Sequence, residues 1–418
     1  MERTRAEQLK RLRQGLPSVL RGNPFYRRRL LDVRGWDDFE RLPFTTKADL
    51  VADQAATPPF GTNLTFALDR YVRVHQTSGS SGLAPLRWLD TAESWEWWRR
   101  IWAEHVYEAA GVGARDRVLL AFSFGPFIGF WSAFAGAEQL GALVIPGGAM
   151  TTEQRARAIM ELGATVLCCT PTYALRLAEV AAGLGIDLSA SPLRVTIHAG
   201  EPGASIPATR DAIDRAFGAY AMDHSGMTEL GPTGFSCVMR DGLHLIESEF
   251  IFEVSRPQDT TETGGVPSEA TASEGSGELI ATNLGRWGSP LIRYRTGDRV
   301  RLSREPCPCG SPFPKLAGGI LGRVDDMVTV RGVNLYPSQV EDIVRRHPEV
   351  VEFVIEHRRE RHLDEVTLVV ECGDGAQLAE RLEAELRQAL GARIGVRQVA
   401  PGTLPRPELK AKRLIRIS

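Results

Sequence analysis

Four short apolar runs decide the fold of this chain: VLLAF (118–122), ALVIP (142–146), TVLCC (165–169) and RVTIH (194–198). Amphipathic, helix-patterned stretches separate them, most clearly residues 152–162 and 173–184. Apolar strands that alternate with such helices are typical of a mainly parallel sheet with helices on both faces. The sequence therefore predicts an α/β protein whose sheet begins near residue 117.

Upstream of these runs, residues 1 to about 70 have a helical pattern. Leu9, Leu12 and Leu16 recur at helical spacing, and residues 43–47 supply a turn and a Thr N-cap. We expect this stretch to cover the sheet. Residues 258–277, rich in Thr, Ser, Gly and Glu, lack apolar periodicity and predict an exposed loop or hairpin excursion without a catalytic role.

Downstream, the pattern restarts as a small unit after residue 322. One helix face there carries Val340, Ile343, Val344 and His347, a second helix carries Leu378, Leu382, Leu386 and Leu390, and strand-like runs cover residues 351–355 and 365–370. We therefore predict a large N-terminal α/β domain, residues 1–322, and a small α+β C-terminal domain, residues 323–418.

Composition narrows the function. The chain has 50 basic and 52 acidic residues among 418, which gives no electrostatic footprint of a nucleic-acid or anionic-membrane binder. The charged start lacks a signal-peptide core, and no apolar run approaches the roughly 20 residues that span a bilayer. We expect a cytoplasmic enzyme. Its six cysteines are too few for a disulfide framework, so they are core residues or metal ligands.

The stretch HQTSGSSG (75–82) combines hydroxyl groups with glycines, so that backbone N–H groups and side chains can both approach an anion. Its candidate phosphate-binding residues are Thr77, Ser78, Gly79, Ser80, Ser81 and Gly82. It is not a Walker A sequence, because Gly-Lys-Ser/Thr is absent. Taken alone, the stretch is also compatible with a surface turn.

Further motifs follow in order: AGEP (199–202), SGMTE (225–229), YRTGD (294–298), GRVDD (322–326) and a basic tail with Lys410. From about Thr77 to the C-terminus, the chain resembles the adenylate-forming superfamily of acyl-CoA synthetases, adenylation domains and luciferases. RGVNLYPSQVE (331–341) makes it most similar to the phenylacetate-CoA ligase branch.

This resemblance implies ATP, Mg²⁺ and coenzyme A as cofactors. A carboxylate attacks the α-phosphorus of ATP, so two anions meet and the site must compensate their charge. The resemblance implies that the residue 77–82 loop holds the β- and γ-phosphates, Thr228 contacts the α-phosphate and Glu229 ligates Mg²⁺. Asp298 would accept hydrogen bonds from the ribose hydroxyls beside Arg323.

The resemblance also implies the remaining nucleotide contacts, which are Gly200, Glu201 and Pro202 along the adenine together with Asp223, Ser225, Gly226 and Met227. Lys410 would be the catalytic lysine of a mobile lid, with Lys412 as the alternative assignment. The lid would pivot at Asp325 and bring Gly332 to the CoA channel for thioester formation.

The chain departs from the family pattern at two places. Gly82 is followed by Leu83 where relatives usually carry a lysine, so one phosphate contact is missing or supplied elsewhere. Ser225 replaces the tyrosine that usually precedes the glycine of the Gly-Met-Thr-Glu motif, which removes an aromatic shelf near the adenine or acyl group.

Cysteine and histidine residues suggest a metal site. Cys237, His244, Cys307 and Cys309 form a Cys₃His set suited to structural Zn²⁺, as in some relatives, although buried free cysteines are the alternative interpretation. The other cysteines, Cys168, Cys169 and Cys372, are expected in the core.

The acyl pocket is expected near residues 121–134, where the branch gathers aromatic residues. Phe127, Gly129 and Ala199 are the candidates, whereas most other aromatic residues there are expected in the core.

Together these features predict an AMP-forming aryl-acid CoA ligase acting on a phenylacetate- or benzoate-like acid. Two alternatives stay open: an adenylation enzyme that passes the acyl group to a carrier protein or amine, and a non-catalytic zinc-containing binding protein. No nucleic-acid or membrane partner is expected. Relatives are often dimers, so a homodimer also stays open.

Overall fold

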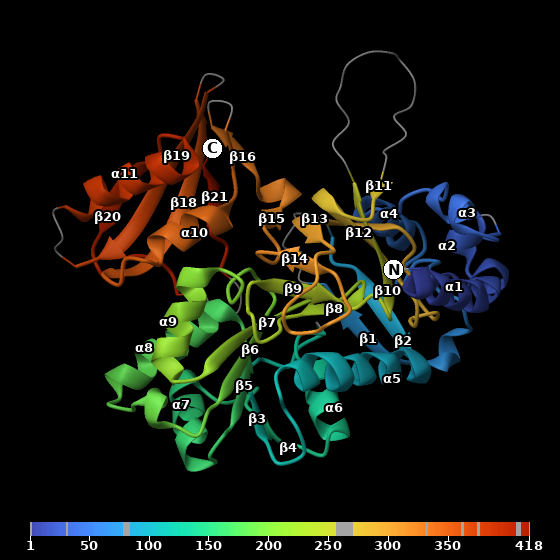
Figure 1. Ribbon diagram of the computed structural model, residues 1–418, viewed down its shortest axis with the longest axis horizontal. Coiled ribbons are helices and arrows are strands. Elements are labelled where there is room, and N and C mark those ends of the chain that lie inside the picture. The colour runs from blue at the N-terminus through green and yellow to red at the C-terminus, as the bar shows by residue number, and fades with distance from the viewer. Residues whose placement is uncertain are drawn as a thin grey trace.

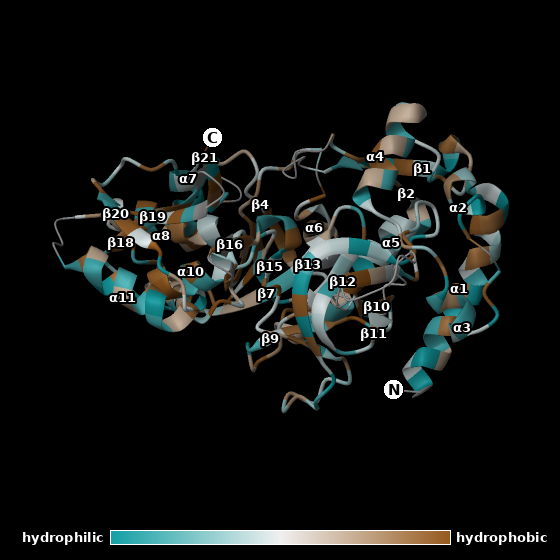
Figure 2. Cartoon of the chain, turned by 90° about the horizontal axis from the view of Figure 1, so that it is seen from above, coloured by the Kyte–Doolittle hydropathy of each residue, from teal (hydrophilic) through white to brown (hydrophobic). Residues whose placement is uncertain are grey.

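The computed structural model of the chain describes residues 2–30, 32–77, 84–126, 128–255, 271–330, 333–360, 363–373, 377–406 and 411–417. A 13-stranded sheet forms its centre, in the order β11-β10-β12-β13-β14-β9-β8-β7-β6-β5-β3-β4, with β15 paired to β13 (Figure 1). The N-terminal helices and the C-terminal sheet lie at opposite ends of the molecule in both views (Figure 2).

The parallel half of the sheet contains the four runs that the sequence singles out. Its strands are β3 (Arg117–Leu120), β4 (Leu143–Pro146), β5 (Val166–Cys169), β6 (Val195–Ala199) and β7 (Tyr220–Met227). The connecting helices are α6 (Trp131–Gln139), α7 (Thr152–Glu161), α8 (Pro171–Gly183) and α9 (Pro207–Phe217), with a short 3-10 turn, η3 (Leu188–Ala190). The predicted α/β class is confirmed.

The other half of the sheet is antiparallel, which the apolar runs do not indicate. It contains β8 (Gly231–Phe235), β9 (Gly242–Leu245), β10 (Phe250–Ser255), β11 (Thr271–Ala272), β12 (Gly275–Asn283), β13 (Tyr294–Ser303), β14 (Lys315–Ala317) and β15 (Gly322–Arg323). The direction changes at β7, which pairs in parallel with β6 and antiparallel with β8. Of the predicted excursion at residues 258–277, the described part enters β11 and β12, and residues 256–270 lie outside the described chain.

The predicted N-terminal helices are confirmed as α1 (Glu2–Gly22), α2 (Pro24–Arg27), α3 (Trp36–Glu40) and α4 (Lys47–Ala56). Thr46 caps α4, since its side chain accepts a hydrogen bond from the Asp49 N–H. A short turn, η1 (Leu68–Arg70), leads to a hairpin of β1 (Tyr71–Gln76) and β2 (Arg87–Thr91). The hairpin is followed by α5 (Ala92–Ile101) and a π-helical turn, η2 (Trp102–Tyr107).

After β15, a short turn η4 (Val324–Asp326) leads to a C-terminal unit with its own core. It comprises β16 (Val328–Val330), β17 (Val333–Leu335), α10 (Pro337–Val344), β18 (Val350–Glu360), β19 (Leu363–Cys372), α11 (Leu378–Leu390), β20 (Gly395–Val399) and β21 (Leu414–Ile417). Buried side chains such as Phe353, Leu368 and Leu382 form this separate core. The predicted helices and strands are confirmed, except that α10 ends at Val344 and leaves His347 beyond the helix, and the boundary at residue 322 stays a prediction.

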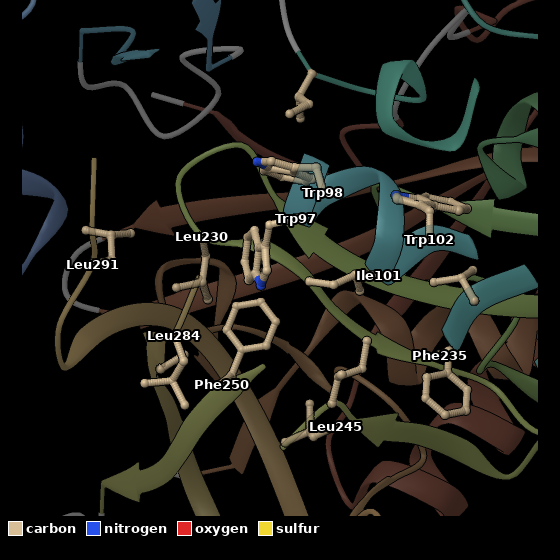
Figure 3. Close-up of a cluster of buried hydrophobic side chains, with 14 of the residues drawn as sticks. Trp97, Trp98, Ile101, Trp102, Leu230, Phe235, Leu245, Phe250, Leu284 and Leu291 are labelled. Atoms are coloured by element: carbon tan, nitrogen blue, oxygen red, sulfur yellow. The ribbon is translucent and has the colours of Figure 1, made fainter. Parts of the chain in front are cut away.

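The aromatic residues of α5 and η2 pack into the main core (Figure 3). Trp97 lies with its ring centroid 5.3 Å from that of Phe250 on β10, and Trp102 is 1% exposed. The helix α6 approaches this layer closely at Gly136, where an added Cβ would lie 2.6 Å from the Trp102 Cβ. The close approach therefore requires a glycine inside the helix.

A pair of Gly→Ala variants tests this packing. Alanine normally stabilises a helix interior relative to glycine by up to about 1 kcal/mol. At Gly136 we expect the opposite sign, a loss of about 1–3 kcal/mol, because the new methyl group would overlap Trp102. Urea unfolding measures both, with Gly183→Ala at the end of α8 as control, since its added Cβ would meet no neighbouring segment within 4 Å. Stabilisation by Gly136→Ala would contradict the packing described.

Candidate active site

The candidate site lies at the carboxyl ends of β6 and β7, where the sheet changes from parallel to antiparallel. Ala199 ends β6 and is in register with His224 on β7. Gly200 follows with a φ of +99°, a conformation that favours glycine. In open α/β sheets, ligands bind in the crevice outside the carboxyl ends of strands at such a switch point.

The turn that carries Thr228 and Glu229 directly follows β7, and Arg286 holds its backbone in place. The Arg286 Nη1 donates to the Thr228 carbonyl at 2.6 Å and to the Glu229 carbonyl at 3.0 Å. The other side of the same guanidinium forms two 2.7 Å hydrogen bonds to the Asp90 carboxylate. Both side chains are 0% exposed. The position of the Thr228 turn is therefore set by a buried, bidentate ion pair.

Asp90 belongs to β2 and so connects this turn to the β1–β2 hairpin. Burial alone would raise the pKa of Asp90, but Arg286 and His75 together outweigh burial and hold the pKa below its usual value. Trp88 and Trp98 flank Arg286, with its guanidinium carbon 5.3 and 5.2 Å from their ring centroids. On β1, the Nδ1 of His75 lies 3.7 Å from the Asp90 carboxylate.

The same hairpin presents the predicted phosphate loop. At its base, the Thr77 N–H donates to the Leu86 carbonyl and the Leu86 N–H donates to the Thr77 Oγ1, both at 2.9 Å. The predicted contacts Ser78, Gly79, Ser80, Ser81 and Gly82 lie outside the described residues. The base of the loop is thus anchored to the strand pair that contains Asp90.

A lysine lies beside the predicted Mg²⁺ ligand. Glu229 is 8% exposed, and its carboxylate is 3.8 Å from the Nζ of Lys47, the first residue of α4. Sequence reasoning noted a missing lysine after Gly82 but did not assign Lys47. The sequence feature that could have pointed to Lys47 is its place at the start of a helix, directly after Thr45 and Thr46.

The predicted ribose pair is brought together. Asp298 on β13 accepts a 3.1 Å hydrogen bond from Arg323 on β15, which also donates to the Thr296 carbonyl at 2.7 Å. Burial raises the pKa of Asp298 to about 6, against the opposing effect of Arg323. The Nε of Arg323 donates to Asp325 at 3.2 Å, so the predicted hinge residue contacts the same guanidinium.

Two of the predicted nucleotide contacts have side chains occupied by protein partners. The Asp223 carboxylate accepts hydrogen bonds from the Ser205 N–H and hydroxyl, and burial raises its pKa to about 7. The Ser225 hydroxyl lies 3.0 Å from that of Thr233. Gly226 and Met227, the next two residues, are more exposed.

Glu201 takes a position that the sequence does not suggest. Its carboxylate accepts hydrogen bonds from the Thr172 N–H at 2.9 Å and from the Ala411 N–H of the C-terminal unit at 2.7 Å. Desolvation there raises the pKa of Glu201, and these hydrogen bonds oppose the rise. Pro202, the next residue, is exposed.

The aromatic segment expected at the acyl pocket is largely core. Phe122 and Phe130 are buried in a T-shaped pair with centroids 5.1 Å apart, whereas Phe124 and Trp131 are only partly buried. Gly129 has a φ of +40°, and an added Cβ would lie 2.1 Å from the Phe122 ring. Gly129 therefore permits the packing of Phe122. Phe127 lies outside the described residues, as do Gly332 and Lys410.

The four predicted metal ligands lie together around His244 on β9. The donor atoms of Cys237, His244, Cys307 and Cys309 all lie within 4.8 Å of one another. The Cys237 and Cys307 sulfurs are 3.8 Å apart, and the Cys309 sulfur is 3.3 Å from the His244 Nε2. Two sulfurs at the usual Zn–S distance of about 2.3 Å in a tetrahedron would be about 3.8 Å apart. The set fits zinc.

The second ring nitrogen of His244 supports the same geometry. Its Nδ1 is 2.9 Å from the Phe313 carbonyl oxygen, so it is the protonated donor and leaves Nε2 free to bind a cation.

Known proteins share this architecture. Residues 332–416 match the family described as AMP-binding enzyme C-terminal domain. The chain is 34% identical to phenylacetate-coenzyme A ligase from Thermus thermophilus, over 97% of this chain and 95% of the relative. It is 32% identical to the enzyme of that name from Escherichia coli, over 99% of this chain and 95% of the relative.

Among solved structures, 2-hydroxyisobutyryl-CoA ligase in its postadenylation state with 2-HIB-AMP superposes with a TM-score of 0.90 at 30% identity, covering 98% of this chain and 89% of that one. The same ligase with CoA in the thioesterification state gives a TM-score of 0.72 at 30% identity, covering 99% of this chain and 90% of that one. The arrangement of the two parts therefore resembles the postadenylation state more closely.

The fold is that of the adenylate-forming ligases. Within that class, the chain belongs to the phenylacetate-CoA ligase family. Among the described helices, none has the length and apolar character to cross a bilayer.

Replacing Arg286 tests the buried pair. Arg286→Met leaves the Asp90 carboxylate buried without its partner, and we expect the free energy of unfolding to fall by about 3–5 kcal/mol. The double variant Asp90→Leu/Arg286→Met should recover most of this loss, because apolar replacement of a whole buried pair is often neutral. Urea unfolding measures both. A single variant as stable as the unaltered chain would contradict the described role.

Proposed function

We propose that this chain is an AMP-forming acid-CoA ligase for an aryl carboxylic acid. It converts the acid and ATP to an acyl-adenylate and diphosphate, then transfers the acyl group to the thiol of CoA and releases AMP. The observation that supports this proposal is the buried Arg286, which joins Asp90 on the β1–β2 hairpin to the carbonyls of Thr228 and Glu229. Full-length similarity to phenylacetate-CoA ligases supports the substrate class.

Each group has a proposed task. Thr228 donates to the α-phosphate, Glu229 provides a carboxylate for Mg²⁺, and Asp298 accepts hydrogen bonds from the ribose hydroxyls. Mg²⁺ would neutralise phosphate charge as it develops. Lys47 supplies the ammonium group that the phosphate loop lacks after Gly82, which its 3.8 Å approach to Glu229 supports.

The C-terminal unit, residues 323–418, is the proposed mobile lid. Lys410 contacts the α-phosphate and the substrate carboxylate during adenylation, and rotation near Asp325 then brings Gly332 to the CoA channel. The two TM-scores against different states of one ligase support a pose on the adenylation side.

The choice of acid needs a panel. The half-buried Phe124 and Trp131 favour a flat ring, while a relative of high structural similarity acts on a small branched hydroxy acid according to its name. Phenylacetate, benzoate and 2-hydroxyisobutyrate therefore form the minimal panel, each assayed by acid-dependent ATP–pyrophosphate exchange and then with CoA. Exchange without thioester would favour a carrier-protein or amine acceptor, and no exchange with any acid would favour a binding protein.

Lysine variants test the site within this assay. We expect Lys410→Ala to reduce the exchange rate by roughly 100-fold or more, because it removes a cation from the transition state. Lys47→Ala should reduce exchange by a smaller factor and raise the KM for ATP, since it removes a phosphate contact. Lys412→Ala is the matched control. Equal loss in Lys410→Ala and Lys412→Ala would show that the catalytic lysine is misassigned.

The Cys₃His cluster is proposed as a structural Zn²⁺ site, since a closed set of four protein ligands leaves no open position for chemistry. Protein washed with a weak chelator should retain stoichiometric zinc by elemental analysis. Cys309→Ser should lose zinc and unfold at a lower temperature, whereas Cys372→Ser, in the C-terminal core, should keep the metal. Absence of zinc from the washed, unaltered protein would remove this proposal.

A further inference from the structure

Glu201 joins the two parts of the chain through backbone hydrogen bonds. One carboxylate oxygen accepts from the N–H of Thr172, the second residue of α8, and the other accepts from the N–H of Ala411 in the C-terminal unit. The first N–H groups of a helix have no partner within the helix, so the Thr172 N–H is available to orient the carboxylate. Glu201 is thereby held on one side and holds Ala411 on the other.

On the C-terminal side, the segment after Ala411 is fixed to its own domain. Arg413 is 8% exposed and forms an ion pair with Glu352 on β18, and the Ile355 N–H donates to the Arg413 carbonyl at 2.7 Å. β21 then continues in parallel with β18. A restraint on Ala411 is therefore a restraint on the whole C-terminal unit.

A second carboxylate joins the two units, this time from the C-terminal unit to a backbone N–H of the N-terminal part. Asp342 on α10 accepts a 3.2 Å hydrogen bond from the Ala208 N–H in the first turn of α9. In Figure 1, α9 lies directly below α10. By contrast, the Arg406–Glu179 pair across this interface is 3.8 Å long and its Glu179 side chain is 45% exposed, so it contributes little.

We propose that Glu201 is a positioning residue for adenylation: its carboxylate links α8 to Ala411 and thereby holds the C-terminal unit in the arrangement that adenylation requires. This inference rests on the proposed function. It differs from the expectation that Glu201 lies along the adenine, because both carboxylate oxygens are committed to protein N–H groups.

Glutamine at this position should not replace glutamate. Two N–H donors converge on the carboxylate, and a carboxamide offers one acceptor oxygen and directs its NH₂ group at the other donor. Hydrogen bonds to charged groups are stronger than those between neutral groups. If one is lost only in the arrangement used for adenylation, the adenylation rate should fall by about 10- to 100-fold.

The test separates the two half-reactions in the full-length protein. The first is ATP–pyrophosphate exchange with the panel acid that the unaltered chain uses best, and the second is thioester formation from the synthetic acyl-adenylate and CoA. We expect Glu201→Gln to lower kcat for exchange by about 10- to 100-fold, with a much smaller change in thioester formation. Glu179→Gln, the same change at the exposed pair, should leave both rates near those of the unaltered chain.

The lid side provides a second pair of variants. Asp342→Ala should lower exchange by about 2- to 10-fold, and Asp342→Asn, which keeps an acceptor for the Ala208 N–H, should restore it. Thermal unfolding of each variant identifies any general loss of folding. If Glu201→Gln fails to fold, the comparison of Asp342→Ala with Asp342→Asn tests the inference instead.

The outcomes are distinct. A raised KM for ATP with unchanged kcat in Glu201→Gln would assign Glu201 to the nucleotide and overturn the inference. Equal loss of both half-reactions in a folded variant, or Asp342→Asn no better than Asp342→Ala, would also overturn it. Failure of exchange in the unaltered chain with every acid would instead remove the proposed function itself.

Discussion

The buried ion pair between Asp90 and Arg286 is the interaction on which the candidate site depends. It joins the hairpin that anchors the phosphate loop to the turn that carries Thr228 and Glu229, two segments more than a hundred residues apart in the chain. Its carboxylate and guanidinium are fully buried, so removing either partner would leave an uncompensated charge in the core. This contact therefore holds the β1–β2 hairpin, at the base of the proposed phosphate loop, against the turn of Thr228 and Glu229.

Much of this arrangement follows from the sequence. The apolar runs at residues 118–122 and 165–169 predict parallel strands because only strands buried on both faces are apolar throughout. Helical periodicity predicts α7, α8 and α11 for the same reason of burial. The pairing of Asp298 with Arg323 and the convergence of the four Cys and His side chains were expected from ordered motifs, and the structure brings both sets together.

Other features could not be read from the chain because they depend on tertiary partners. Arg286 lies in a Gly-rich turn that carries no motif, and Asp90 lies in the short strand β2, whose sequence RWLDT does not indicate that the strand is buried. Glu201 occupies a recognised motif, yet its partners Thr172 and Ala411 come from different domains. The antiparallel half of the sheet has no clear signal in the sequence, because its strands mix polar and apolar residues, as in GSGELIATN of β12.

We propose that the groups at the carboxyl ends of β6 and β7, together with Asp298 on β13 and Arg323 on β15, activate a carboxylate on ATP. A rapid-quench experiment tests it most directly, by mixing the protein with phenylacetate, benzoate or 2-hydroxyisobutyrate and ATP–Mg²⁺ in the absence of CoA. We expect an acyl-adenylate to accumulate in proportion to the enzyme and to be converted to the CoA thioester when CoA is added. ATP consumption that yields ADP or free AMP without any acyl-adenylate, or no reaction with any acid, would contradict it.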